Sequence, residues 1–96
     1  MRRASKTDAN QSEIVAALRA IGASVHDTSA VGRGFPDLVV GHRGRNFLIE
    51  CKDGAKVPSA RKLTPDQVDF KAGWLGHWAV AISAADAVAI ITAGSQ

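Results

Sequence analysis

The sequence lacks the features that mark disulfide-bonded, zinc-binding and membrane-spanning proteins. Its single cysteine, Cys51, has no partner for an internal disulfide, and no second Cys or His lies at zinc-binding spacing from it. No apolar run approaches the roughly 20 residues that a membrane helix needs. The basic start, MRRASKTDAN, is followed by no apolar segment and is not typical of a secretory signal. We therefore expect a cytoplasmic protein with no membrane partner.

What is present indicates one small globular domain. With 96 residues the chain lies near the lower limit for independent folding, and its hydrophobic fraction of 46% is ordinary for a protein with a core. There are no repeats, low-complexity tracts or linkers. We expect a basic tail over residues 1–7, a core over about 8–83 and a C-terminal segment over 84–96.

The pattern of apolar and turn-forming residues predicts the element order α-β-β-β-α-β. Apolar residues at helical spacing indicate a first helix over residues 8–20, with Thr7 or Asp8 as its cap. The further elements are strands at residues 23–28, 38–40, 47–52 and 78–82, a helix at 64–75, and a short helix or strand from Ser83 or Ala84. A three-stranded meander flanked by helices is an α/β sandwich, so we expect a mixed central sheet that the helices cover.

The second helix begins with a capping sequence. Thr64 suits the N-cap, Pro65 the first helical position, and Gln67 can close a capping box.

Two carboxylates are expected to meet on the hairpin of the second and third strands. If the turn is centred on Arg43 and Gly44, residues whose numbers sum to 87 face each other, so Asp37 lies opposite Glu50. Side chains alternate along a strand, so Lys52 shares the face of Glu50. Opposed carboxylates need positive charge between them, from the lysine or from a divalent cation such as Mg²⁺. These groups are suited to hydrolysing a phosphodiester.

The string Pro36-Asp37, followed after twelve residues by Glu50-x-Lys52, resembles the motif of the PD-(D/E)xK nuclease superfamily. The surrounding residues are similar to those of VRR-NUC domains and archaeal-type Holliday junction resolvases. These residues are Glu13 in the first helix, then Leu63-Thr64-x-x-Gln67 and Trp74-x-Gly76 after the lysine. The resemblance covers roughly residues 10–83 and implies a restriction-endonuclease-like core.

The resemblance also implies residue roles, a cofactor and a substrate. Asp37, Glu50 and the backbone carbonyl of Cys51 would bind Mg²⁺ or Mn²⁺. Lys52 would activate the attacking water, and Glu13 would be an outer ligand of the metal or of a water. Gln67 would be an accessory positioning residue. The implied substrate is branched or structured DNA, and a homodimer with two active sites would suit a two-fold branched junction.

Basic residues near this centre are candidates for contacts with the phosphate backbone. The net charge of +3 is compatible with a polyanionic partner. The candidates are Arg33 between two glycines, and Lys56, Arg61 and Lys62 in the segment 53–63; Arg2, Arg3 and Lys6 form another cluster. A solvated loop and tail are the alternative reading.

Two other functions remain open. The chain could be a non-cutting nucleic-acid-binding or regulatory module, or a small interaction protein with an accidental acidic-lysine pattern. If the acidic-lysine pattern is accidental, Asp37 and Glu50 should be far apart or separately exposed. Gln67 could act only as a cap, whereas Trp74 and Trp78 could be core, dimer-contact or base-stacking residues. The apolar stretch AVAII near the C-terminus could pack in a dimer interface.

Overall fold

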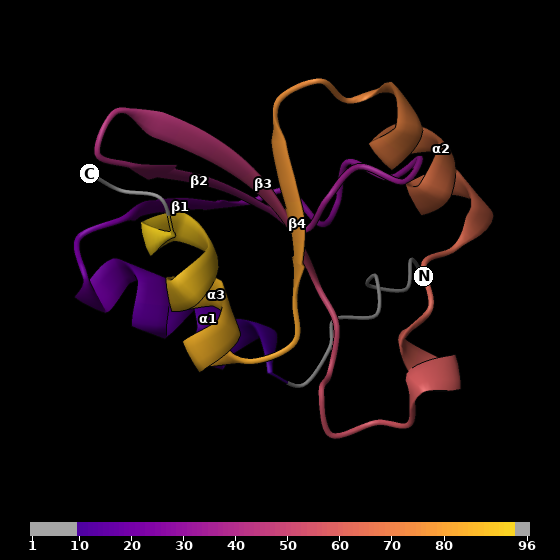
Figure 1. The fold of residues 1–96 in the computed structure, drawn as a ribbon, viewed down its shortest axis with the longest axis horizontal. Helices are drawn as coiled ribbons and strands as arrows, with labels where there is room; N and C mark the ends of the chain where they lie inside the picture. Colours follow the sequence, from indigo (N-terminus) through magenta and orange to yellow (C-terminus); the bar gives the residue numbers. More distant parts are fainter. Residues whose placement is uncertain (1–9, 94–96) are drawn as a thin grey trace, which may run out of the picture.

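The computed structural model describes residues 10–93 as an α/β fold with a four-stranded mixed sheet and three α-helices (Figure 1). The elements are α1 (Gln11–Ala20), β1 (Ser24–Asp27), β2 (Leu38–His42), β3 (Arg45–Cys51), the 3₁₀ turn η1 (Pro58–Arg61), α2 (Pro65–Gly73), β4 (His77–Ala81) and α3 (Ala84–Thr92). The predicted element order is confirmed, and the final element is a helix rather than a strand. The expected basic tail and the cap candidates Thr7 and Asp8 lie outside the described residues, and Asn10 occupies the N-cap of α1.

The sheet has the strand order β1-β2-β3-β4. The first three strands form the expected antiparallel meander, whereas β4 pairs with β3 in parallel. The turn between β2 and β3 has positive φ at Arg43 (51°) and at Gly44 (80°), as a two-residue type I′ turn requires. The paired residues run from Leu38 with Ile49 to His42 with Arg45, which confirms the predicted register.

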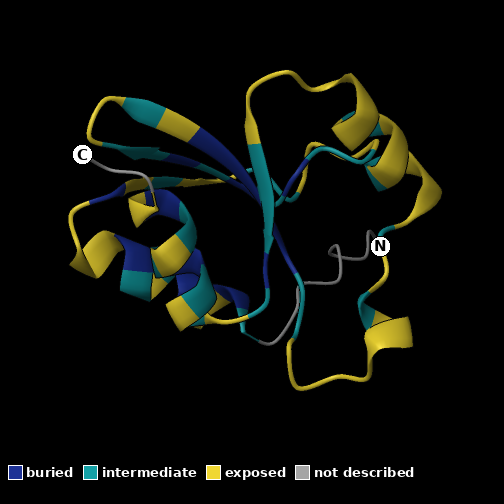
Figure 2. Cartoon of the chain, viewed as in Figure 1, coloured by how far each residue is buried: buried dark blue, intermediate teal, exposed yellow. Residues whose placement is uncertain are grey.

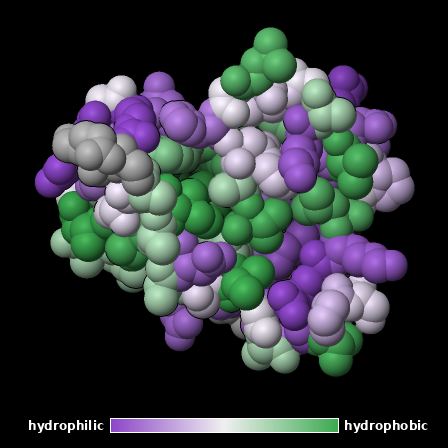
Figure 3. All heavy atoms as spheres, in the orientation of Figure 1, coloured by the Kyte–Doolittle hydropathy of each residue, from purple (hydrophilic) through white to green (hydrophobic). Residues whose placement is uncertain are grey.

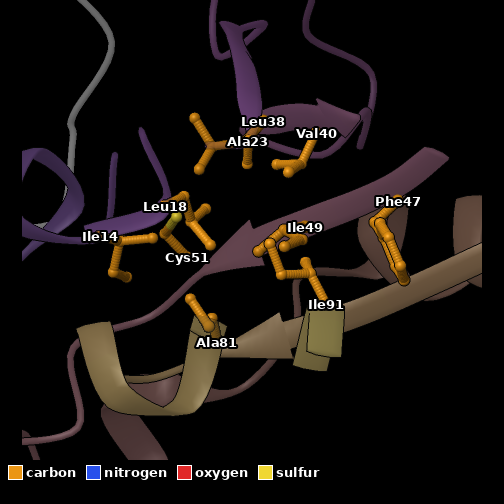
Figure 4. Close-up of a cluster of buried hydrophobic side chains, with 11 residues drawn as sticks. Ile14, Leu18, Ala23, Leu38, Val40, Phe47, Ile49, Cys51, Ala81 and Ile91 are labelled. Atoms are coloured by element: carbon orange, nitrogen blue, oxygen red, sulfur yellow. The ribbon is translucent and has the colours of Figure 1, made fainter. Parts of the chain in front are cut away.

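The hydrophobic core lies on one face of the sheet, beneath α1 and α3. Figure 4 shows side chains from both parts pointing toward one another. The buried cluster consists of Ile14, Leu18, Ala23, Leu38, Val40, Phe47, Ile49, Cys51, Ala81, Ala87 and Ile91. Since Ala87 and Ile91 belong to α3, the core extends past residue 83. The apolar C-terminal stretch therefore packs largely within its own chain, and its expected place in a dimer interface stays a prediction.

The helix α2 differs from α1 and α3 because it contains no buried residue. Figure 2 shows α2 and η1 as mostly exposed segments beside the end of the sheet that lies away from the β2–β3 turn. The expectation that helices cover the sheet therefore holds for α1 and α3 but not for α2. None of the described helices is long and apolar enough to cross a membrane.

Candidate active site

The two carboxylates predicted to face each other lie at the end of the β2–β3 hairpin. Because Leu38 pairs with Ile49, the next position along the same register sets Asp37 against Glu50. The Oδ2 atom of Asp37 accepts a hydrogen bond from the backbone N–H of Cys51, at 2.8 Å. This contact fixes the Asp37 carboxylate on the opposing strand. The separated carboxylates that an accidental pattern predicts are therefore not found.

The backbone around Asp37 is held from the side of β1. Thr28 donates from its N–H to the carbonyl of Asp37 (2.7 Å) and from its hydroxyl to the carbonyl of Pro36 (2.8 Å). Next to it, Asp27 accepts hydrogen bonds from the side chain and the N–H of Ser29, which hold the pKa of Asp27 below its ordinary value. These bonds close the base of the loop over residues 28–37, so Asp37 enters β2 in a defined position.

Glu50 is a buried carboxylate with two polar neighbours. The residue is only 4% exposed, and its Oε2 atom accepts a hydrogen bond from Nε2 of Gln67 at 2.7 Å. The Nζ atom of Lys52 lies 3.6 Å from the same oxygen. Burial, followed by the charge of Asp37, raises the pKa of Glu50 to about 8, while Lys52 opposes this shift. Burial is thus the main reason for the raised pKa of Glu50, and repulsion by Asp37 adds to it.

Gln67 joins the start of α2 to the carboxylate centre. Its Oε1 atom accepts hydrogen bonds from Nζ of Lys52 (3.2 Å) and from the N–H of Thr64 (2.9 Å). The hydroxyl of Thr64 accepts from the N–H of Gln67, which completes the predicted capping box. Gln67 thus caps the helix, as predicted, and contacts both Glu50 and Lys52. Its accessory role in catalysis stays a prediction.

The loop over residues 28–37 passes directly against the first turn of α2. Gly34 has φ of 80°, and a Cβ atom built there would lie 2.2 Å from the carbonyl oxygen of Asp66. Only glycine permits this approach. Beside it, the ring of Phe35 meets the ring of Phe70 edge to face, with centroids 5.2 Å apart. These contacts and the Gln67 side chain hold α2 at the site.

Asn10 supports the same region and was not anticipated from the sequence. Its Nδ2 atom donates to the backbone carbonyls of Lys52 and Ile82, both at 3.0 Å. These residues follow β3 and β4, so Asn10 links the ends of the two strands to the start of α1. An Asn directly before a helical apolar pattern is a common N-cap signal. Here the side chain bonds to the strand ends and makes no capping hydrogen bond.

Glu13, the implied outer ligand, is not brought into this group. It is exposed in the first turn of α1, whereas its neighbour Ile14 is fully buried. Successive side chains on a helix are about 100° apart, so the burial of Ile14 turns Glu13 toward solvent. Among residues 10–93, no group of three or more His, Cys, Asp or Glu side chains could hold a metal ion. An outer-ligand role for Glu13 therefore has no support in this arrangement.

The residues at the centre still suit one hard divalent cation. Mg²⁺ binds through one or two carboxylates together with carbonyl oxygens, waters and substrate phosphates. Asp37 and Glu50 supply two carboxylates, and a cation between them would relieve the repulsion that, after burial, raises the pKa of Glu50. Cys51 would contribute its backbone carbonyl only, because its thiol is buried in the hydrophobic core. The donor set is entirely oxygen, which matches Mg²⁺ or Mn²⁺.

The basic candidates lie on two segments near this end of the sheet. Arg33 is exposed in the loop that contacts α2, and Lys56 and Lys62 are exposed on either side of η1. Arg61 is half-buried and donates from Nε to the carbonyl of Lys56 at 2.9 Å, so it braces its own loop. Figure 3 shows hydrophilic side chains gathered between α2 and η1.

Comparisons of the chain with protein-family models, with curated proteins and with solved structures give no significant match. Function is therefore inferred from the geometry of the residues described above.

Proposed function

We propose that the chain is a metal-dependent endonuclease of the PD-(D/E)xK class, with a restriction-endonuclease-like core, that hydrolyses phosphodiester bonds in DNA. The proposal rests on the convergence of Asp37, Glu50 and Lys52 at one end of a hairpin. Two observations support it. The β2–β3 register sets Asp37 against Glu50, and Gln67 contacts both Glu50 and Lys52.

The chemistry divides between a cation and the side chains. A bound Mg²⁺ or Mn²⁺ would neutralise phosphate charge and lower the pKa of a bound water. Lys52 carries a proton-donating group next to Glu50, and Gln67 holds its Nζ by a hydrogen bond. From this position Lys52 would orient the attacking water or, when deprotonated, accept its proton.

Branched or otherwise structured DNA is the proposed substrate. A domain of 96 residues has little surface for reading a base sequence, whereas recognition of shape needs mainly backbone contacts. Arg33, Lys56 and Lys62 are the exposed cations proposed to contact phosphates, with Arg61 supporting the loop. A homodimer would present two sites to a junction with two-fold symmetry.

A non-cutting binding module is the second candidate. The contacts of Lys52 and Gln67 with Glu50 fit this module as well as they fit the nuclease. In such a module these contacts would be permanent and structural.

Cleavage assays with matched variants test the proposal. Single-stranded, duplex, flap and four-way-junction DNAs would be incubated with Mg²⁺, Mn²⁺ or EDTA. We expect metal-dependent cleavage that falls by about 10²–10³-fold in Asp37→Asn and in Lys52→Ala, the size of loss seen when a principal electrostatic contact is removed. Asp69→Asn, which changes an exposed carboxylate of α2, is the control and should cleave normally.

The folding of each variant would be checked by circular dichroism and thermal unfolding. DNA that is bound but never cut would favour the binding module. Cleavage unchanged in both site variants would refute the assigned centre.

A further inference from the structure

Lys52 belongs to the proposed centre through its side chain, but its backbone lies just past the end of a strand. The strand β3 ends at Cys51, and the segment 53–63 that follows Lys52 is mostly exposed. The Nζ atom of Lys52 nevertheless reaches both Glu50 and Gln67. Residues at the end of a sheet open readily unless further bonds hold them. A fixed position of the lysine therefore requires an anchor for its backbone.

Both backbone polar groups of Lys52 are hydrogen-bonded. Its N–H donates to the carbonyl of Ala81 at 3.0 Å, which extends the pairing of β3 with β4 by one residue. Its carbonyl accepts from Nδ2 of Asn10, also at 3.0 Å. The first bond comes from the sheet, whereas the second comes from a side chain 42 positions earlier in the chain. The amide of Asn10 thus holds the lysine where β4 no longer can.

The same amide also holds the end of β4. Nδ2 of Asn10 donates to the carbonyl of Ile82 at 3.0 Å, and this carbonyl also accepts from the N–H of Gly54. The N–H of Ile82 in turn donates to Oδ2 of Asp86 in α3. An amide NH₂ group has two hydrogens, and here each has its own acceptor. Asn10 therefore bridges the two strand ends at the point where they separate.

The contacts of Asn10 serve the strands rather than its own helix. An asparagine at an N-cap usually accepts a hydrogen bond from the first turn through its side-chain oxygen. Asn10 makes no such bond, and its Oδ1 atom is buried without a partner among residues 10–93. A buried acceptor without a hydrogen bond costs stability. The orientation of the amide is therefore explained by its two donated bonds and not by capping.

We propose that Asn10 is a positioning residue that fixes Lys52 for the attack on the phosphodiester. The inference rests on the proposed nuclease function, and it assigns the contribution of α1 to Asn10 instead of the exposed Glu13. Without the amide, the end of β3 would be free to separate from β4 and carry the lysine away from Glu50. A displacement of about 1 Å at a reacting group can lower a rate by about 100-fold.

Two substitutions remove the donated bonds in different ways. Asn10→Asp keeps the size of the side chain and its suitability as an N-cap, but it has no N–H to donate. Asn10→Ala removes the donors without adding a charge. An effect that both variants share therefore belongs to the amide donors.

Rates and affinities separate positioning from binding. Single-turnover cleavage with Mn²⁺ would be measured at saturating protein on the preferred DNA of the panel, and Kd in EDTA by fluorescence anisotropy. We expect the rate to fall by about 10- to 100-fold in both variants, as for other residues that orient catalytic groups, with Kd changed by less than about twofold.

Two controls account for general effects on the fold. Nη2 of Arg19 donates to the carbonyl of Val25 at 3.1 Å, so Arg19→Ala also removes a bond from α1 to a strand, but at the other end of the helix. Ile91→Val weakens the core without touching the centre. Both should cut at the wild-type rate at a temperature where every variant is folded.

Amide hydrogen exchange measured by NMR in EDTA tests the anchor without any cleavage. The N–H groups of Lys52 and Gly54 bond to the end of β4. In both Asn10 variants these amides should exchange about 2- to 10-fold faster, the factor for loss of one hydrogen bond. Arg19→Ala should leave them unchanged.

The outcomes distinguish this inference from the nuclease itself. Wild-type cleavage rates in both Asn10 variants would overturn the positioning role and leave the nuclease intact. A loss of rate matched by a rise in Kd, or by an equal loss in Ile91→Val, would overturn it as well. Faster exchange at Lys52 in a chain that cuts with no metal would support the anchor and refute the nuclease.

Discussion

Two parts of the molecule are held together by different kinds of interaction. The body, made of the sheet with α1 and α3, is joined by buried apolar side chains, which pack without strong directional requirements. The helix α2 buries no residue and is joined to the body through Gln67, the close approach at Gly34 and the Phe35–Phe70 contact. The stability of the fold and the geometry of the site therefore depend on largely separate residues.

Truncation in the body should have the largest effect on stability. Ile49 is fully buried, and Ile49→Ala should lower the free energy of unfolding by about 2–5 kcal/mol because it removes apolar contacts and leaves a cavity. Val68→Ala on α2 should change it by no more than about 0.5 kcal/mol. Urea unfolding of both variants would measure the contrast. Equal losses would show that α2 belongs to the core.

The pH dependence of stability should report on the Glu50 carboxyl. Its pKa in the folded protein, about 8, exceeds the ordinary value of 4.5, so the folded protein keeps a proton that the unfolded chain releases. The contribution of Glu50 is therefore fully present below about pH 4.5 and is lost as pH rises through about 8. In EDTA, the wild-type chain should lose stability over this interval, and Glu50→Gln should lose less. Parallel curves from urea unfolding at pH 5 and pH 8 would contradict this assignment.

Two glycines in the loop over residues 28–37 allow a matched test of how α2 is attached. Gly32 and Gly34 have φ of 81° and 80°, so an alanine at either position costs about 1–2 kcal/mol in backbone strain. A Cβ atom at Gly32 meets nothing within 4 Å, whereas one at Gly34 collides with the backbone of Asp66. Gly34→Ala should therefore also displace α2 and abolish hydrogen-exchange protection of its first turn. If Gly32→Ala has the same effect on α2, the proposed contact is not responsible.

The smallest expected loss of stability comes from removing a helix N-cap, and two caps can be compared. Thr64 accepts a hydrogen bond at the start of α2, and Ser83 does so at the start of α3. Substitution of either by alanine should cost about 1 kcal/mol of stability. Only Thr64→Ala should also lower cleavage, by about tenfold, because it releases the side chain that supports Lys52 and Glu50. Thermal unfolding and initial cleavage rates would separate the two variants, and equal cleavage rates would remove Thr64 from the support of the site.

The features predicted correctly from the sequence depend on local chemistry. A two-residue turn at Arg43 and Gly44 sets the hairpin register by itself, and that register sets Asp37 against Glu50. The capping box depends only on Thr64 and Gln67, which are three residues apart. Both features could be read from the sequence because no distant part of the chain decides them.

The features missed from the sequence depend on contacts between distant segments. The place of β4 beside β3 within the expected mixed sheet and the burial of Ile91 in α3 arise from tertiary packing, which helical or strand periodicity does not encode. The exposure of Glu13 arises in the same way, since the rotation of α1 is set by the burial of Ile14 and Leu18. Asn10 was missed because its amide bonds to strand ends rather than to its own helix.

The hydrogen bonds of Gln67 bear on how far the segment between β3 and α2 can change in length. Lys52 at one end and Thr64 at the other both bond to this one side chain, so the segment 53–63 is a loop with fixed ends. Doubling the length of such a loop costs only about 0.6 kcal/mol in closure entropy. Insertions near residues 55–60 should therefore leave the arrangement of Asp37, Glu50 and Lys52 intact. The segment is a natural position for adding substrate-contacting modules, by evolution or by engineering.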